Sequence, residues 1–95
     1  DTSVNCKCYS IIICGQVQGV GYRYFVLKAA ANFKVRGWVR NNRDSSVEIE
    51  CEGKEDDLKA FMAKLEKGPA YSRITSIETR EKPYQGVYSG FSIEY

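Results

Sequence analysis

The residues best suited to chemistry in this sequence are a short glycine-rich segment and the arginine that follows it. Gly15, Gly19 and Gly21 lie within seven residues, and Arg23 stands two residues later. A glycine-rich loop that leads into a helix presents free backbone N–H groups and the positive end of the helix dipole, which together attract anions. An arginine in the first helical turn adds a planar fork that can hold two phosphate oxygens at once. The segment therefore predicts a phosphate-binding site.

The segment does not match the common nucleotide-binding or cysteine-phosphatase loops. It lacks the G-x4-G-K-[ST] pattern, and Tyr24 stands where a dinucleotide fingerprint needs its third glycine. Cys14 has no arginine six residues later, so a cysteine-phosphatase cradle is not supported. On these residues alone, a phosphate site and a purely structural role, with packed glycines and a solvated Arg23, stand as equal alternatives.

The chain contains no histidine, which narrows the possible chemistry. Ser-His-Asp and Cys-His nucleophiles, phosphohistidine intermediates and most zinc hydrolases are excluded. Cys6 and Cys8 form C-x-C rather than the C-x2-C of zinc sites, so we expect no metal and no cofactor. Together with Cys14 and Cys51 they are predicted to be free thiols.

Length and composition predict one small globular domain spanning residues 1–95, with residues 1–7 loosely ordered. The chain is 43% apolar and 27% charged, and its net charge is +2. This weak positive balance favours an anionic ligand and does not by itself indicate nucleic acid. The sequence has no apolar run long enough to cross a membrane and no signal-peptide pattern, so we expect a cytoplasmic protein without membrane contact.

Hydrophobic periodicity predicts an α+β fold. Period-two patterns indicate strands and period-3.6 patterns indicate helices, and the residues before and after each pattern mark its ends. The predicted strands are residues 9–14, 35–41, 46–52, 74–81 and 91–95, and the predicted helices are residues 22–33 and 54–67. The order βαββαβ, with a further short strand, is typical of a ferredoxin-like sandwich, an antiparallel sheet with both helices on one face.

Strand alternation predicts which side chains face those helices. Tyr9, Ile11 and Ile13 should point inward together with the apolar residues of 47–51, which leaves Cys8, Ser10, Ile12 and Cys14 on the opposite face. Cys14 and Cys51 then point to opposite sides of the sheet, which disfavours a disulfide between them.

Two motifs resemble those of one enzyme family. Residues 15–23, GQVQGVGYR, resemble the acylphosphatase signature G-x-V-Q-G-V-[GF]-[FY]-R. Residues 37–48, GWVRNNRDSSVE, resemble the family's second segment, G-[WFY]-[VA]-x-N-x-x-D-G-x-V-E, and residues 67–69 and Gly53 are similar as well. One departure is Ser45, where the family usually has glycine. The resemblance covers the chain from Tyr9 to its end.

The resemblance implies an acylphosphatase, which hydrolyses the carboxyl–phosphate bond of an acyl phosphate to a carboxylate and inorganic phosphate, and we expect this phosphate to inhibit as well. It implies Arg23 and Asn41 as catalytic residues, with Asn41 positioning the attacking water; on spacing alone, Asn41 would be interpreted as a strand-end residue capping a turn. We also expect a monomer. The residues implied to bind phosphate are Gly15, Gln18, Gly19, Val20, Gly21, Tyr22 and Arg23.

This reaction requires few catalytic groups from a protein. The leaving carboxylate has a pKa of about 4, so no general acid is needed at neutral pH, which fits a chain without histidine. The remaining tasks are to neutralise the phosphoryl charge and to hold a water in line. As the resemblance implies, the proton of the water can pass to the phosphate of the substrate.

Other functions of the same fold stay open at this point. Residues 36–39, RGWV, faintly resemble an RNA-recognition motif, but the outward Glu48 and Glu50 would repel a phosphate backbone. The acylphosphatase-like domain of the large carbamoyl-transfer proteins of hydrogenase maturation is a closer alternative, although the zinc-finger and further segments that follow it there do not occur in this sequence. A third alternative is a non-catalytic regulatory module, which the presence of both Arg23 and Asn41 disfavours.

Overall fold

The computed structural model describes residues 6–18, 21–69 and 72–94 of the chain. The strands and helices in these residues follow one another in the order predicted from the sequence. They are β1 (Cys6–Gln16), α1 (Tyr22–Asn32), β2 (Arg36–Asn41), β3 (Val47–Lys54), α2 (Glu55–Lys67), β4 (Arg73–Lys82) and β5 (Phe91–Glu94).

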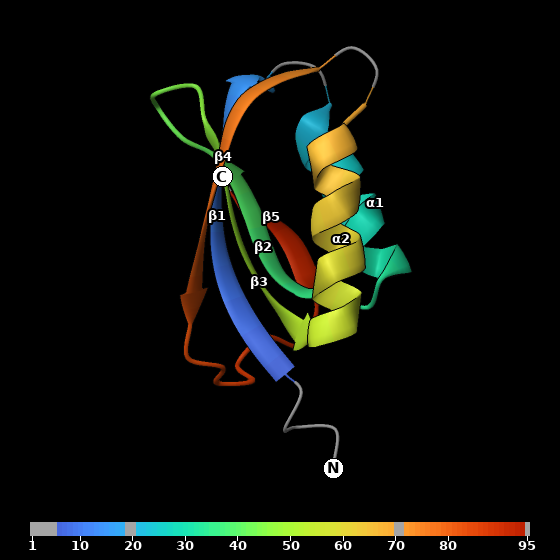
Figure 1. Cartoon of the computed structure of the whole chain (residues 1–95). Coiled ribbons are helices and arrows are strands. Elements are labelled where there is room, and N and C mark those ends of the chain that lie inside the picture. The colour runs from blue at the N-terminus through green and yellow to red at the C-terminus, as the bar shows by residue number, and fades with distance from the viewer. Residues whose placement is uncertain (1–5, 19–20, 70–71, 95) are drawn as a thin grey trace.

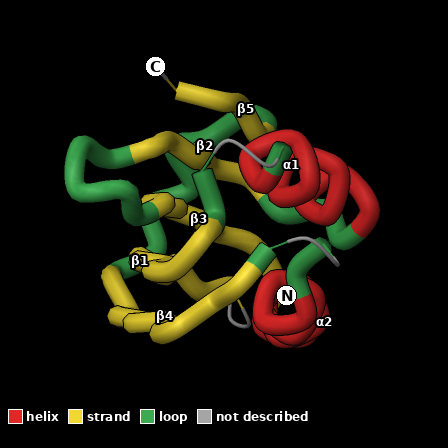
Figure 2. Tube along the Cα trace, turned by 90° about the horizontal axis from the view of Figure 1, so that it is seen from above, coloured by secondary structure: helices red, strands yellow, loops and turns green. Residues whose placement is uncertain are grey.

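The strands form one sheet, and both helices cover the same face of it. The strand order is β4-β1-β3-β2-β5. Figure 1 shows α1 and α2 side by side against one face, and the view from above in Figure 2 shows the two layers. The predicted ferredoxin-like α+β fold is confirmed.

One pair of strands departs from the expected antiparallel sheet. β5 runs parallel to β2, with Gly37 opposite Phe91, whereas the other strand pairs are antiparallel. The reason lies in the connection before β5. β4 occupies the edge beside β1, and residues 83–90 carry the chain to the far edge, where β5 arrives in the same direction as β2.

The first strand is longer at both ends than the sequence predicted. β1 begins at Cys6, and Cys6 and Lys7 pair with Lys54 and Gly53, although both residues were expected in a loosely ordered start. β3 runs on to Lys54 and offers them backbone partners. Residues 1–5 of that expectation lie outside the described residues.

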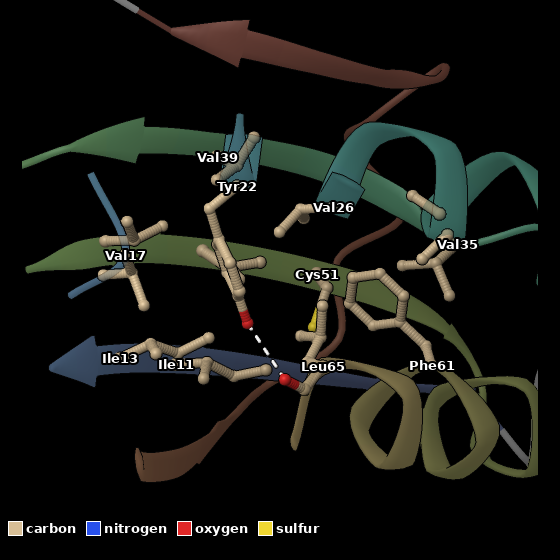
Figure 3. Close-up of a cluster of buried hydrophobic side chains, with 14 of the residues drawn as sticks. Ile11, Ile13, Val17, Tyr22, Val26, Val35, Val39, Cys51, Phe61 and Leu65 are labelled. Atoms are coloured by element: carbon tan, nitrogen blue, oxygen red, sulfur yellow. Dashed lines mark hydrogen bonds between the residues drawn. The ribbon is translucent and has the colours of Figure 1, made fainter. Parts of the chain in front are cut away.

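The core fills the space between the sheet and the helices as strand alternation predicted. The inward side chains of β1 and β3 are buried against those of the two helices (Figure 3). Tyr9 is partly buried and packs against this cluster. The central members are Ile11, Ile13, Val47, Ile49, Cys51, Val26, Phe61 and Leu65.

The loop after β4 covers part of the opposite face. Glu52 is 1% exposed and accepts hydrogen bonds from the backbone N–H groups of Gly86 and Tyr88 at 3.3 and 3.1 Å. The Tyr88 hydroxyl donates to Glu50 and accepts from the indole of Trp38. Cys8 points to this outer face, as predicted, yet it is buried as well.

The four cysteines are free thiols in the structure. Cys8 and Cys51 are buried, whereas Cys6 and Cys14 are partly exposed. Burial raises the pKa of the Cys51 thiol to about 12, with a smaller contribution from the nearby Cys8. Cys51 therefore serves as a small apolar side chain of the core.

Tyr22 connects the start of α1 to the end of α2. It is 1% exposed, and its hydroxyl donates to the carbonyl oxygen of Leu65 at 3.0 Å (Figure 3). That carbonyl belongs to the last turn of α2, where the helix itself offers no partner. Burial raises the pKa of the phenol, so the hydroxyl keeps the proton that it donates.

Removing this hydroxyl should loosen the contact between the helices. We expect Tyr22→Phe to lower the free energy of unfolding by about 1–2 kcal/mol, because it leaves the Leu65 carbonyl buried without a donor. Urea unfolding followed by circular dichroism measures the change. Tyr24→Phe is the matched control, because Tyr24 is 65% exposed. Equal shifts in the two variants would contradict this role.

Candidate active site

The glycine-rich loop leaves the sheet at a point of very close strand packing. Gly15 has φ +134°, and the pairing of β1 with β4 shifts its register between Cys14 and Gly15. A Cβ atom at Gly15 would lie 2.0 Å from the carbonyl oxygen of Arg73. The first glycine of the loop is therefore required by packing against β4, as the structural interpretation of the sequence proposed.

The loop ends at a helix start that has no cap of its own. Gly21 is the N-cap residue of α1, with φ +75°, and no side chain of the described residues caps the helix. The first turn of α1 carries no acidic residue either. In α2, by contrast, Glu55, Asp56 and Asp57 complement the dipole. The start of α1 thus keeps backbone N–H groups and positive potential for an external anion.

Of the residues predicted to bind phosphate, those after Gly21 begin the helix. Tyr22 turns its side chain into the core, so only its backbone N–H can face the loop. Arg23 is half-buried in the first helical turn. Gly19 and Val20 lie outside the described residues.

Gln18 brings the loop to the hairpin between β2 and β3. Its carboxamide nitrogen donates to the backbone carbonyl oxygens of Asn42 and Ser46, both at 2.8 Å. The neighbouring Val17 is 1% exposed and belongs to the core. In Figure 1 the end of β1, the start of α1 and this hairpin lie at the same end of the molecule. Sequence reasoning missed the contact, because no local pattern indicates which distant carbonyls a glutamine will reach.

Asn41 is the last residue of β2 and lies directly beside this contact. It pairs with Val47 of β3. Its side-chain oxygen Oδ1 is buried and has no hydrogen-bond partner among the described residues. Leaving a buried acceptor without a donor costs about 1–3 kcal/mol, so this atom is suited to a ligand or a water.

The hairpin after Asn41 is closed by its own hydrogen bonds. The backbone N–H of Asn42 donates to the Ser46 carbonyl at 2.9 Å, and the Asn42 carboxamide donates to the Ser46 hydroxyl at 3.1 Å. That hydroxyl and the Ser46 backbone N–H both donate to the Asp44 carboxylate. Hydrogen bonds from the Ser46 side chain, and then from its backbone, lower the pKa of Asp44.

The part of the chain that the structure describes contains neither a cluster of metal ligands nor a helix able to span a membrane. Within the described ranges, no three histidine, cysteine or acidic side chains gather as ion ligands would. No helix of that part of the chain is long and apolar enough to cross a bilayer.

A hollow of about 590 Å³ lies between the end of α1 and the start of α2. It is lined by Lys34, Arg36, Lys54 and acidic residues of α2, and it is separate from the glycine-rich loop.

Comparison with known proteins identifies the family of this chain. The family model described as Acylphosphatase matches residues 9–93. The acylphosphatase of Bacillus licheniformis is 44% identical over 87 residues, which cover 92% of this chain and 97% of that protein. The acylphosphatase of Bacillus subtilis is 42% identical over 87 residues, which cover 92% of this chain and 96% of that protein.

Solved structures agree with the sequence relatives. The crystal structure of the Bacillus subtilis acylphosphatase matches with a TM-score of 0.90, covering 94% of this chain and 99% of that one. An acylphosphatase from Coxiella burnetii matches with a TM-score of 0.92 at 28% identity, covering 99% of this chain and 98% of that one. Full-length HypF, in its phosphate- and nucleotide-bound form, matches at 37% identity with a TM-score of 0.88, but over 95% of this chain and only 12% of that one.

The protein is therefore an enzyme that hydrolyses an acid anhydride. It belongs to the acylphosphatase family, as its two motifs predicted, and its reaction converts an acyl phosphate into a carboxylate and inorganic phosphate.

The one departure from the family motif has a structural cost. Ser45 has φ +75°, in the left-handed region that favours glycine, and its side chain is exposed. We expect Ser45→Gly to raise the free energy of unfolding by about 0.5–1 kcal/mol, because relief of backbone strain exceeds the added flexibility of the unfolded chain. Urea unfolding measures the change.

Ser89→Gly is the control for this prediction, because Ser89 is an exposed loop residue outside the positive-φ positions. It should leave stability unchanged or lower it. Equal destabilisation by both substitutions would refute the strain at Ser45.

Proposed function

We propose that the acyl phosphate binds between Arg23, the backbone amides of the glycine-rich loop and Asn41, and that Asn41 holds the attacking water. The phosphoryl group would lie against the amides of Gly15, Gln18, Gly19, Val20, Gly21, Tyr22 and Arg23. The observation that carries this proposal is the buried, unpartnered Oδ1 of Asn41 beside the hairpin that the loop contacts.

The phosphate end of the substrate needs positive charge with little water. An uncapped helix start offers backbone N–H groups whose dipoles already point outward, so they need no reorganisation as charge develops on the phosphoryl oxygens. The Arg23 guanidinium supplies a full positive charge in the same helical turn, and its fork can hold two oxygens.

The attacking water needs a hydrogen-bond acceptor that fixes its orientation. A water that donates one O–H to Asn41 Oδ1 satisfies the buried acceptor and directs an oxygen lone pair away from it. Holding the nucleophile in line removes much of the entropic part of the barrier.

The proton of the attacking water then goes to the substrate. Asp44 is the carboxylate of the neighbouring hairpin, but Ser46 occupies it with two hydrogen bonds and its pKa is lowered, so it is a weak base. A phosphoryl oxygen of the substrate is the more basic acceptor. The carboxylate leaves without protonation because its pKa is about 4.

The proposed roles predict similar losses of turnover for the two side chains and different effects on inhibition by inorganic phosphate. We expect Arg23→Ala and Asn41→Ala each to lower kcat/KM for an aromatic acyl phosphate by about 10³-fold. Arg23→Ala should also raise the inhibition constant of inorganic phosphate, because it removes the charge that grips the anion. Asn41→Ala should leave that constant nearly unchanged, because Asn41 contacts the water.

Arg43→Ala and Asn32→Ala are the controls, because both side chains are exposed and neither belongs to the site. A phosphate monoester, whose alkoxide is a poor leaving group, should not be hydrolysed by any variant. Near-normal turnover by Arg23→Ala or Asn41→Ala would remove that residue from the mechanism.

We also propose that the protein acts in the cytoplasm as a monomer and does not bind nucleic acid. The outer sheet face offers little to an RNA strand, because Glu48 and Glu50 lie there, paired with Arg40 and Lys82 at 2.9 and 2.6 Å. Trp38, the aromatic residue of the RNA-like motif, lies beneath the Arg40 guanidinium, whose carbon Cζ is 5.0 Å from the centroid of the indole ring. The family relationship does not favour the RNA-binding or regulatory alternatives.

Solution measurements test this proposal directly. Light scattering coupled to gel filtration should give a mass near the 10.8 kDa of one chain. Fluorescence anisotropy with a labelled single-stranded RNA should show no binding at near-physiological salt. A dimer mass, or saturable RNA binding, would overturn the corresponding part.

A further inference from the structure

The side-chain nitrogen of Gln18 is fully committed to the hairpin. A carboxamide nitrogen carries two N–H donors. In Gln18 one reaches the Asn42 carbonyl and the other the Ser46 carbonyl, each at 2.8 Å. No side-chain N–H is left for a bound phosphate, so Gln18 can join the phosphate cradle only through its backbone N–H.

The loop around Gln18 is held by contacts that do not involve this side chain. On one side, Gln16 pairs with Arg73 of β4 and Val17 is buried in the core. On the other side, Tyr22 is buried and bonded to Leu65 of α2. The two described ends of the loop, at Val17 and Tyr22, are therefore held on the core without the Gln18 carboxamide.

The hairpin is linked to the loop by Gln18, in addition to the sheet pairing that places Val47 beside both Ile13 of β1 and Asn41 of β2. Its internal hydrogen bonds join Asn42 to Ser46 and fix its shape alone. The bonds from Gln18 end on those same two residues, and Asn42 follows Asn41 directly in the chain. The carboxamide of Gln18 is thus a strut between the loop and the end of β2.

We propose that Gln18 is a positioning residue, which adjusts the distance between the phosphate loop and the Asn41 carboxamide beyond what the sheet pairing of β1, β3 and β2 fixes. The proposal rests on the function proposed above, because it gives Asn41 the attacking water. Through this strut, the water is held in line with a phosphoryl group that the loop grips independently. Loss of the strut lowers the rate of the chemical step and leaves phosphate binding nearly intact.

The test removes both donors at nearly constant side-chain volume. We expect Gln18→Met to lower kcat for an aromatic acyl phosphate about 10–100-fold, the scale of an ångström misplacement of a nucleophile. The inhibition constant of inorganic phosphate should change less than about 3-fold, because the loop keeps its own supports. Gln85→Met is the matched control, because Gln85 is exposed in the distant loop of residues 83–90 and should leave both constants unchanged.

A second variant guards against misfolding. Gln18→Asn keeps the amide but is one methylene too short to reach both carbonyls, so the same split between kcat and phosphate inhibition is expected. Circular dichroism and urea unfolding identify the variants that are folded at the assay temperature.

A double-mutant cycle separates positioning from direct phosphate binding. In an Asn41→Ala background, Gln18→Met should cost less than about 3-fold, because the group that it positions is already gone. Multiplicative losses, or a 10-fold rise of the phosphate constant in Gln18→Met, would overturn the inference.

The outcomes also distinguish this inference from the proposed function. If Asn41→Ala alone keeps near-normal turnover, the role of Asn41 fails and the inference fails with it. If Asn41→Ala is nearly inactive while Gln18→Met behaves like Gln85→Met, only the positioning role of Gln18 fails.

Discussion

The burial of Tyr22 is the constraint on which the site depends. A tyrosine at the first position of α1, packed in the core and bonded to the last turn of α2, determines where α1 begins. The residue before it, Gly21, must then turn the chain in a left-handed conformation, and the residue after it, Arg23, lies in the first turn of the helix. One buried contact between the helices thus fixes the backbone at the start of α1, because both neighbours of Tyr22 are positioned once its side chain is.

The two faces of the sheet contribute different interactions to the fold. The inner face supplies the hydrophobic burial that stabilises the fold. On the outer face, residues 83–90 and Glu52 form a second buried contact, and the charges of Glu48 and Glu50 are matched by Arg40 and Lys82. Polar groups of the outer face are therefore largely satisfied within the protein. The unmet hydrogen-bonding capacity of the described residues lies instead at the loop end, with Asn41 and the start of α1.

The sequence predicted the fold because each level of its pattern agrees with the others. Strand alternation placed Ile11 and Cys51 on the inner face, and acidic residues followed by Gly68 marked the ends of α2. The parallel β5 was not predicted, since strand direction at an edge depends on the path of a long connection. The burial of outward-facing Cys8 had the same origin, because a loop more than 70 residues away covers it.

The site was predictable in its residue types and not in its contacts. The motifs indicated Arg23 and Asn41, but period and spacing say nothing of an orphaned Oδ1 or of the two carbonyls that Gln18 reaches. Gly15 shows the opposite limit: the motif implied phosphate binding for this glycine, and the structure shows that the close approach of the Arg73 carbonyl of β4 requires a glycine there. A motif position can thus be fixed by packing against a neighbouring strand, which the motif itself does not reveal.

The local departures from favourable structure have different causes at the two ends of the molecule. Lys34, with φ +58°, follows the end of α1, where a left-handed residue is a common way to end a helix. At the loop end, left-handed Gly21 and Ser45, an uncapped helix and a buried acceptor occur together. Helix capping does not explain that combination: the left-handed Ser45 and the buried acceptor of Asn41 each lower stability, whereas glycine adopts the conformation of Gly21 without strain. In the proposed complex, the dianion and its attacking water satisfy the helix start and the acceptor together, so substrate binding stabilises this end of the fold.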